Sequence, residues 1–287
     1  MAQKNNLPPF PTEFPHIFVE IAWPLVPEVS YADLVYLSQL VKQVGKEKTY
    51  ESLVDSLRKI QWTKIAGQEA IAIERQIAEQ VNKDAIPFNP VRQVQYSKNL
   101  FDFIANGKAA LDSAAVFLNT FLNLNRDGPE RDFRKVSFCQ IVCSYDTVIG
   151  KHIKTLAEWL DKDRRTSDSI VATRDEWLHR GRPAIVAIFP PTELGYFPIP
   201  KALTLELPSP GTPLTGDYYY KTQEFIEFHL QKLFALFMVI VKRCIDVEEK
   251  LAPKHIQRDS LPVTAPLSVF PLRATMNSTI NKIRLHL

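Results

Sequence analysis

The hydrophobic positions after residue 30 recur with the spacing of an amphipathic α-helix. Ser30 is a residue type that favours the N-cap of a helix, and Gly45 is one that ends helices in a left-handed conformation. Between them, leucine and valine return every three or four positions, as 3.6 residues per turn requires, at Leu34, Leu37, Leu40, Val41 and Val44. The pattern predicts a helix over 30–45.

Two further helices are predicted before residue 90. One is expected over 47–60 and the other over 64–82, where isoleucines recur among alanines. Pro87 and Pro90 follow, and proline disfavours the helical conformation at the residue before it. We take this proline pair as an internal boundary, so that residues 1–90 form an N-terminal arm and helical region.

The longest predicted helix covers about 94–124. Its apolar positions form one continuous stripe, made of Phe101, Ile104, Leu111, Ala115, Leu118 and Leu122. Lys108 and Asp112 lie one turn apart beside this stripe. Such a pair is ordinarily a surface ion pair that contributes about 0.3 kcal/mol, unless it faces a binding site.

The second half of the chain continues with helices and one interruption. A charged loop with a Gly-Pro pair at 125–132 precedes two helices, over 133–145 and 147–162. β-branched and aromatic runs at about 184–207 indicate a small β-hairpin or irregular insertion. A long phenylalanine-rich helix is then expected from 217 to 251.

These elements predict a mainly α fold. We expect a helical bundle at 91–252, with an N-terminal helical extension and the small hairpin as an insertion. The last part of the chain, 253–287, contains four prolines and is expected to form a strap or tail.

Composition is that of a globular protein and excludes several function classes. The 287 residues are 45% hydrophobic and 23% charged, and the net charge of +3 is too small to indicate a nucleic-acid or membrane partner by itself. With 9 glycines, the chain holds no G-x-G-x-x-G, G-x-x-x-x-G-K or G-x-S-x-G motif. Dinucleotide-binding, P-loop and α/β-hydrolase chemistry therefore lose their main support.

Cysteine content and hydrophobic runs indicate a compartment. Three cysteines are too few for a secreted disulfide scaffold, and the proline-rich N-terminus has no apolar run typical of a signal peptide. The most apolar window, 233–241, is shorter than the roughly 20 residues that cross a bilayer, so we interpret it as part of a buried helix. We expect a cytoplasmic protein without a membrane partner.

The stretch TRDEWLHRGRP, residues 173–183, has two interpretations. As a helix C-terminus it is well explained, because Gly181 suits the left-handed position and Pro183 prevents continuation. Arg174 and His179 also lie about 140° apart on a straight α-helix. If the helix ends here, however, the two groups can converge, and imidazole plus guanidinium are the groups that metal-free RNA cleavage needs.

The sequence Arg174-Asp175-Glu176-Trp177-Leu178-His179 resembles the Arg-x4-His signature of the HEPN superfamily of all-α proteins. The segment GKAALDSAAVFLN, residues 107–119, is also similar to the first bundle helix of some bacterial HEPN-like proteins. The resemblance covers about 90–250. It implies a HEPN-like helical bundle. The family includes many RNases of toxin–antitoxin, abortive-infection and CRISPR systems, so the resemblance also implies an RNase that acts in a toxin or phage-defence system.

The resemblance also implies roles for individual residues. Arg174 would hold the phosphate, His179 would transfer a proton, and Asp175 would orient either of them. Two motifs usually meet across a dimer in this family, which implies a homodimer and leaves room for an antitoxin or another protein partner. Arg180 and Arg182 would add cations for an RNA backbone, and Lys108 and Asp112 would join them if they face the site. No metal or other cofactor is implied.

A non-catalytic helical module that binds RNA, a nucleotide or a partner protein remains the alternative. A zinc site at Cys139, Cys143 and His152 is disfavoured because no second ligand pair follows, so these cysteines are expected to be buried free thiols. His229 lies within an aromatic helix and is expected to be a hydrogen-bonded bundle residue. The three tyrosines at 218–220 are placed at a helix start, where at most two could stack on bases.

Overall fold

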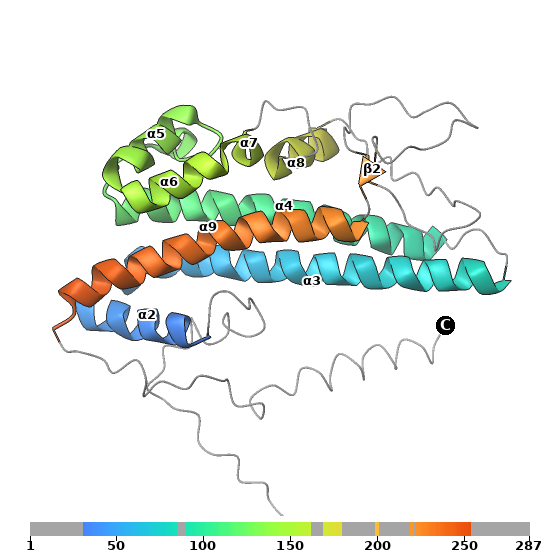
Figure 1. Ribbon diagram of the computed structural model, residues 1–287, viewed down its shortest axis with the longest axis horizontal. Coiled ribbons are helices and arrows are strands. Elements are labelled where there is room, and N and C mark those ends of the chain that lie inside the picture. Colours follow the sequence, from blue (N-terminus) through green and yellow to red (C-terminus); the bar gives the residue numbers. More distant parts are fainter. Residues whose placement is uncertain are drawn as a thin grey trace, which may run out of the picture.

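The computed structural model describes residues 31–84, 90–161, 169–179, 199–200, 219–220 and 222–253, and this part of the chain is mainly helical, as predicted. Figure 1 shows the arrangement of the elements. The helices are α2 (Tyr31–Val44), α3 (Glu47–Asp84), α4 (Pro90–Phe121), the 3-10 helix η1 (Gly128–Glu130), α5 (Val136–Tyr145), α6 (Thr147–Thr155), α7 (Ala157–Leu160), α8 (Ile170–His179) and α9 (Thr222–Leu251). Two short strands, β1 (Ile199–Pro200) and β2 (Tyr219–Tyr220), complete them.

Helices α3, α4 and α9 form the long axis of the molecule (Figure 1). The helix pair α3 and α4 runs antiparallel, with α9 along both, and α2 packs against α9 near its C-terminal end. The short helices α5 to α8 lie on the other side of α4, where α8 contacts α4 and α6 contacts α9. One hydrophobic core includes residues from α2 and α3 as well as from α4 to α9, so it continues across the expected boundary at residue 90.

Two separate helices over 47–60 and 64–82 were a wrong prediction, because α3 is continuous from Glu47 to Asp84. The residues between the two expected helices, Gln61 to Thr63, include neither glycine nor proline and give the backbone no reason to break. The hydroxyl of Thr63 donates a hydrogen bond to the carbonyl of Lys59 at 2.8 Å, as it does inside a regular helix.

The predicted apolar stripe is confirmed at four of its six positions. Leu122 is half-buried and lies just beyond α4, which ends at Phe121 and not at 124 as predicted. Ile104, Leu111, Ala115 and Leu118 are buried, whereas Phe101 is 36% exposed. The reason is that the inward face at this level of α4 is filled by neighbouring positions, including Leu100, Phe103, Ile104 and Gly107, which turns position 101 outward. The apolar window of α9 over 233–241 is mostly buried, as predicted. Five of its side chains are buried, namely Leu233, Leu236, Phe237, Ile240 and Val241, and the others are half-buried, namely Phe234, Ala235, Met238 and Val239.

A buried carboxylate joins α9 to the turn between α2 and α3. Glu248 is fully buried, and its oxygens accept hydrogen bonds from Lys46 Nζ and Tyr50 Oη, each at 2.9 Å. Gly45 allows this turn, since its φ of +69° lies in the left-handed region that glycine adopts without strain. A buried carboxylate is stable only with hydrogen-bonding or charged partners, so the position of Glu248 requires Lys46 and Tyr50 to stay beside it. The contact therefore holds the start of α3 against the C-terminal part of α9.

The hairpin expected at about 184–207 lies mostly outside the described residues. Within it, Ile199–Pro200 is a strand, and it pairs antiparallel with Tyr219–Tyr220. The predicted helix from 217 therefore begins only at Thr222, and two of the three tyrosines belong to a strand rather than to a helix start. Among the described residues, none of the helices combines the length and the apolar character that crossing a membrane requires.

Candidate functional site

The motif lies on α8, and the start of this helix is fixed by its own first residues. Ser169 precedes the helix and is fully buried. Its hydroxyl accepts a hydrogen bond from the backbone N–H of Ala172 at 3.2 Å, and its carbonyl accepts one from the hydroxyl of Thr173 at 2.8 Å. A serine in this position satisfies backbone donors that a helix start leaves unpaired.

Gly107 sets how closely α8 approaches α4. A Cβ atom at this position would lie 2.5 Å from Cδ1 of Ile170, the first residue of α8, and 3.4 Å from Leu233 of α9. Ile170 is fully buried, so little space exists into which it could move. The glycine therefore lets the base of the motif helix rest directly on α4.

Arg174 and Asp175 interact with each other on the outer part of α8. Arg174 Nη1 donates a hydrogen bond to Asp175 Oδ1 at 2.8 Å, and the two side chains are 29% and 30% exposed. The second carboxylate oxygen of Asp175, Oδ2, lies 3.7 Å from Nη1 of Arg134. The motif arginine is thus partly accessible, and it already has an anionic partner.

Arg134 belongs to the connection between α4 and α5 and was not identified from the sequence. Its Nε donates a hydrogen bond to Asp132 Oδ2, its Nη2 forms an ion pair with the same oxygen, and its backbone N–H donates to Asp132 Oδ1 at 2.9 Å. The hydrogen bond to Asp132 is the main factor that raises the pKa of Arg134, and the charges of Asp132, Asp175 and Asp112 contribute further. The available sequence signal was the pair Asp132 and Arg134 at the end of the predicted loop, 40 positions from Arg174. Arg134 itself fell in the helix predicted over 133–145, which begins only at Val136.

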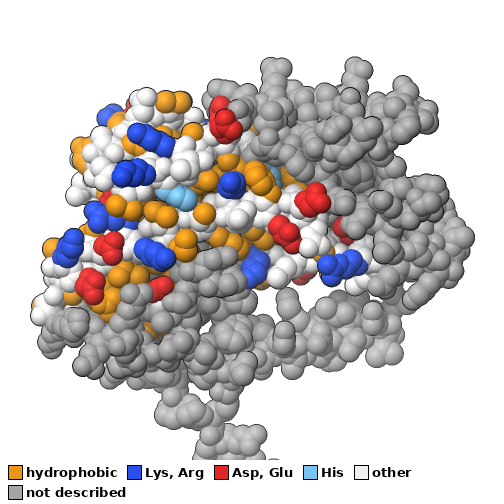
Figure 2. Space-filling view, in the orientation of Figure 1, with side chains coloured by type: hydrophobic (Ala, Val, Ile, Leu, Met, Phe, Trp, Pro, Cys, Tyr) orange, Lys and Arg blue, Asp and Glu red, His pale blue; other side chains and the backbone are white. Residues whose placement is uncertain are grey.

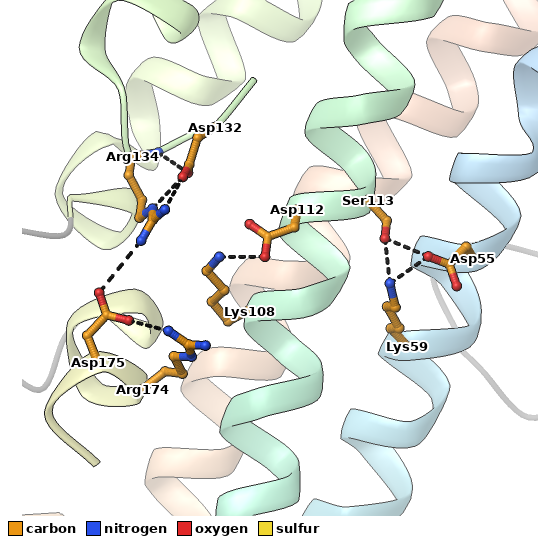
Figure 3. Close-up of polar contacts among 9 residues, drawn as sticks. All are labelled: Asp55, Lys59, Lys108, Asp112, Ser113, Asp132, Arg134, Arg174 and Asp175. Carbon is orange, nitrogen blue, oxygen red and sulfur yellow. Dashed lines mark hydrogen bonds and ion pairs between the residues drawn. The ribbon is translucent and has the colours of Figure 1, made fainter. Parts of the chain in front are cut away.

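Lys108 and Asp112 form the expected i,i+4 ion pair on α4. It is more than a surface pair, because the lysine side chain is only 11% exposed while that of Asp112 is 45% exposed. Figure 3 shows both on the side of α4 that faces Arg174 and Arg134. The structure therefore brings four of the predicted site residues to one junction, together with Arg134.

Three cations and three carboxylates meet at this junction of α4, α8 and the connection after α4. The cations are Lys108, Arg134 and Arg174, and the carboxylates are Asp112, Asp132 and Asp175. The three positive and three negative formal charges cancel. An anion that binds Arg134 or Arg174 must therefore compete with the carboxylate that already occupies that guanidinium. Basic and acidic side chains are also interspersed over the described part of the face in Figure 2.

His179 is the last residue of α8, and its side chain is not among the described ones. Because the helix continues from Arg174 to His179, the two positions lie on faces about 140° apart. Arg180 and Arg182 lie outside the described residues. The described backbone therefore does not bring the two motif positions to one face of a single chain.

A second polar cluster on the other side of α4 ties this helix to α3. Ser113 donates its hydroxyl proton to Asp55 Oδ2 at 2.6 Å, and Lys59 Nζ donates to Ser113 Oγ at 2.7 Å and to Asp55 Oδ2 at 2.6 Å (Figure 3). These bonds lower the pKa of Asp55 against the opposing effect of burial, which is the largest single contribution. We interpret this cluster as an interhelical tie.

The cysteines are free, but Cys139 and Cys143 are half-buried rather than buried as predicted. Both lie on α5, where Cys139 Sγ donates to the Phe133 carbonyl at 3.2 Å and Cys143 Sγ donates to the Gly150 carbonyl of α6 at 3.3 Å. Burial raises the pKa of Cys139 to about 12, which keeps it a thiol. The described residues contain no group of three or more His, Cys, Asp or Glu side chains placed to hold a metal ion.

His229 is fully buried, as predicted for a bundle residue. Its Nδ1 accepts a hydrogen bond from Trp159 Nε1 at 2.9 Å, which links α9 to α7.

Comparison with known protein families, with curated proteins and with solved structures finds no match to this chain.

Proposed function

We propose that this chain is a HEPN-like, metal-independent endoribonuclease. In the proposed reaction the 2′-oxygen of a ribose attacks the adjacent phosphorus and the bond to the 5′-oxygen breaks. The 2′-hydroxyl proton is removed, and a proton is delivered to the leaving 5′-oxygen. The products are a 2′,3′-cyclic phosphate and a 5′-hydroxyl, and His179 carries the proton transfer while Arg174 stabilises the negative charge on phosphorus.

One observation carries this proposal. Arg174 lies at a partly exposed junction where two more cations, Lys108 and Arg134, come from other elements. A planar guanidinium binds two phosphate oxygens at once, and neighbouring cations add to the attraction for an RNA backbone. Two residues of this junction, Lys108 and Asp112, lie on α4, and two, Arg174 and Asp175, lie on α8. The two helices pack directly against each other at Gly107.

We further propose that the active site forms between two copies of the chain. Positions 174 and 179 face about 140° apart on α8, so Arg174 of one copy and His179 of a second copy would complete each site. This arrangement is tested by complementation. Arg174→Ala and His179→Ala are each expected to be inactive, and their equimolar mixture is expected to regain about one quarter of the parent activity, since half of the dimers hold one intact site.

The activity itself is tested by incubating the purified chain with RNA in EDTA. Removal of His179 is expected to slow cleavage by about 100-fold or more, the usual contribution of general acid–base catalysis. Arg126→Ala is a matched control, because Arg126 forms an exposed ion pair with Glu130 outside the junction. If the parent, Arg174→Ala and His179→Ala all cleave RNA at the same background rate, the proposal of an endoribonuclease is refuted.

The alternative is a non-catalytic helical module that binds RNA, a nucleotide or a protein. The observation that favours it is the pairing of all three junction cations with carboxylates. This alternative predicts that the parent chain binds RNA or a protein partner without cleaving RNA, and that His179→Ala leaves the binding unchanged.

A further inference from the structure

Two arginines from separate segments converge on one carboxylate at the junction. Asp175 Oδ1 accepts from Arg174 Nη1 at 2.8 Å, and Asp175 Oδ2 lies 3.7 Å from Arg134 Nη1 (Figure 3). The side chains of all three residues are about one-third exposed, at 29% for Arg174 and 30% for the other two. The carboxylate thus uses each of its oxygens for a different guanidinium.

Asp132 prepares Arg134 for this contact. It holds two nitrogens of the guanidinium and the backbone N–H of Arg134, and its own side chain is only 11% exposed. These bonds fix the plane of the guanidinium and leave Nη1 directed towards α8 (Figure 3). A donor held in place by its surroundings loses little conformational freedom when it binds an anion.

We propose that Arg134 and Arg174 form a seat for one phosphate group, that the Asp175 carboxylate fills this seat in the free protein, and that a phosphate of the ligand displaces it. Carboxylate and phosphate oxygens suit the guanidinium fork in the same way, so either anion satisfies the same donors. The choice of an RNA phosphate rests on the proposed function. Arg134 becomes a substrate-binding residue, and Asp175 becomes a competitor that lowers affinity.

The test uses a ligand that cannot be cleaved. A fluorescent single-stranded 2′-O-methyl oligonucleotide lacks the 2′-hydroxyl nucleophile, and its dissociation constant is measured by anisotropy at fixed ionic strength. Asp175→Asn is expected to bind about five-fold more tightly, because a partly exposed ion pair and a repulsive charge are removed. Arg134→Gln is expected to weaken binding about five-fold and to abolish most of the gain when it is combined with Asp175→Asn.

Asp102→Asn is the matched control. Asp102 pairs with Lys98 at 2.6 Å on α4, so this change alters the net charge and releases a cation in the same way, but outside the two arginines. Its expected effect on binding is less than about two-fold. Equal tightening by Asp102→Asn and Asp175→Asn would show a general charge effect and overturn the seat.

A purely structural role of Asp175 gives a different result. If it only latches α8 to Arg134, then Asp175→Asn and Asp175→Ser lower the melting temperature and do not tighten binding, which would also overturn the proposal. Folding of each variant is checked by circular dichroism, and Arg134→Lys provides a second variant that keeps the charge but not the fork. Its expected affinity lies between those of the parent and Arg134→Gln.

The outcome is separable from that of the proposed nuclease. Tighter binding of the 2′-O-methyl probe by Asp175→Asn, together with no cleavage of RNA by the parent, would keep the phosphate seat and remove the enzyme. RNA cleavage that depends on His179, together with unchanged probe binding by Asp175→Asn, would support the proposed nuclease and refute the proposed phosphate seat.

Discussion

Asp146 makes two contacts at once, and its replacement gives the sharpest test of how α6 is held. Oδ1 accepts hydrogen bonds from the backbone N–H groups of Val148 and Ile149, both at 3.0 Å, which makes Asp146 the N-cap of α6. Oδ2 accepts from Nε of Arg243 on α9 at 2.5 Å. Asp146 thereby connects the start of α6 to α9, and we predict that Asp146→Ala destabilises the protein.

The magnitude follows from these two contacts. Loss of an N-cap side chain costs about 1 kcal/mol. The Asp146 side chain is 2% exposed and that of Arg243 is 28% exposed, so the ion pair is partly screened by solvent and contributes about 1 kcal/mol. Arg243 can reach water after the change, so no buried unpaired charge remains. We expect Asp146→Ala to lower the free energy of unfolding by about 2 kcal/mol.

The assay is urea unfolding followed by circular dichroism, with two further variants. Asp146→Ser keeps an oxygen for the cap and loses the ion pair, so it is expected to cost about 1 kcal/mol. Arg243→Met leaves the Asp146 carboxylate, which is 2% exposed, without its cation, so it is expected to cost about 2 kcal/mol. The two changes combined should cost no more than Arg243→Met alone, because Asp146→Ser removes the charge that Arg243→Met leaves unpaired. A loss with Asp146→Ser as large as that with Asp146→Ala would refute the cap as a stabilising contact.

Three other predictions concern the packing and the pH response. Gly150→Ala would place a Cβ 2.5 Å from the backbone Cα of Cys143, so thermal melts should show a loss of about 1–3 kcal/mol that exceeds the gain of up to about 1 kcal/mol in helix propensity. Tyr50→Phe removes a hydrogen bond to the buried Glu248 and should cost about 1.5–3 kcal/mol in urea unfolding, and an unchanged midpoint would contradict this. Burial, with the nearby Lys232, lowers the pKa of His152 below 6.5, so its neutral form is favoured in the folded state. Its contribution to stability is complete above 6.5 and is lost as the pH falls through this value towards the folded pKa, and His152→Gln should show a smaller drop in melting temperature over that interval.

Hydrophobic spacing was sufficient to predict most helices, because each buries one face against the same core. It placed α2 to within about one residue and identified the buried window of α9. It failed at Gln61 to Thr63, where two helices were predicted instead of one, although no glycine or proline stands between them and the helix therefore continues. Tyr219 and Tyr220 were misplaced because strand pairing with residues 199–200 depends on tertiary contacts.

The candidate site was only partly predictable, because its members come from distant parts of the chain. Arg174 and Asp175 were identified from the motif, and Lys108 and Asp112 from their helical spacing. Arg134 has no motif of its own, and only the packing of α8 on α4 brings Asp175 within reach of it. Charge pairing across 40 residues of sequence is not encoded in local periodicity.

The tight fit at Gly107 has a consequence for the kinetics of ligand uptake. A Cβ on Gly107 would lie 2.5 Å from Cδ1 of the fully buried Ile170, so α8 and α4 touch directly there, and movement of the base of α8 away from α4 would expose this apolar side chain. Exchange of an anion at Asp175 then depends on rotation of partly exposed side chains, which occurs in picoseconds to nanoseconds, rather than on slower helix motion. Stopped-flow association is expected to be a single step whose observed rate rises linearly with ligand concentration.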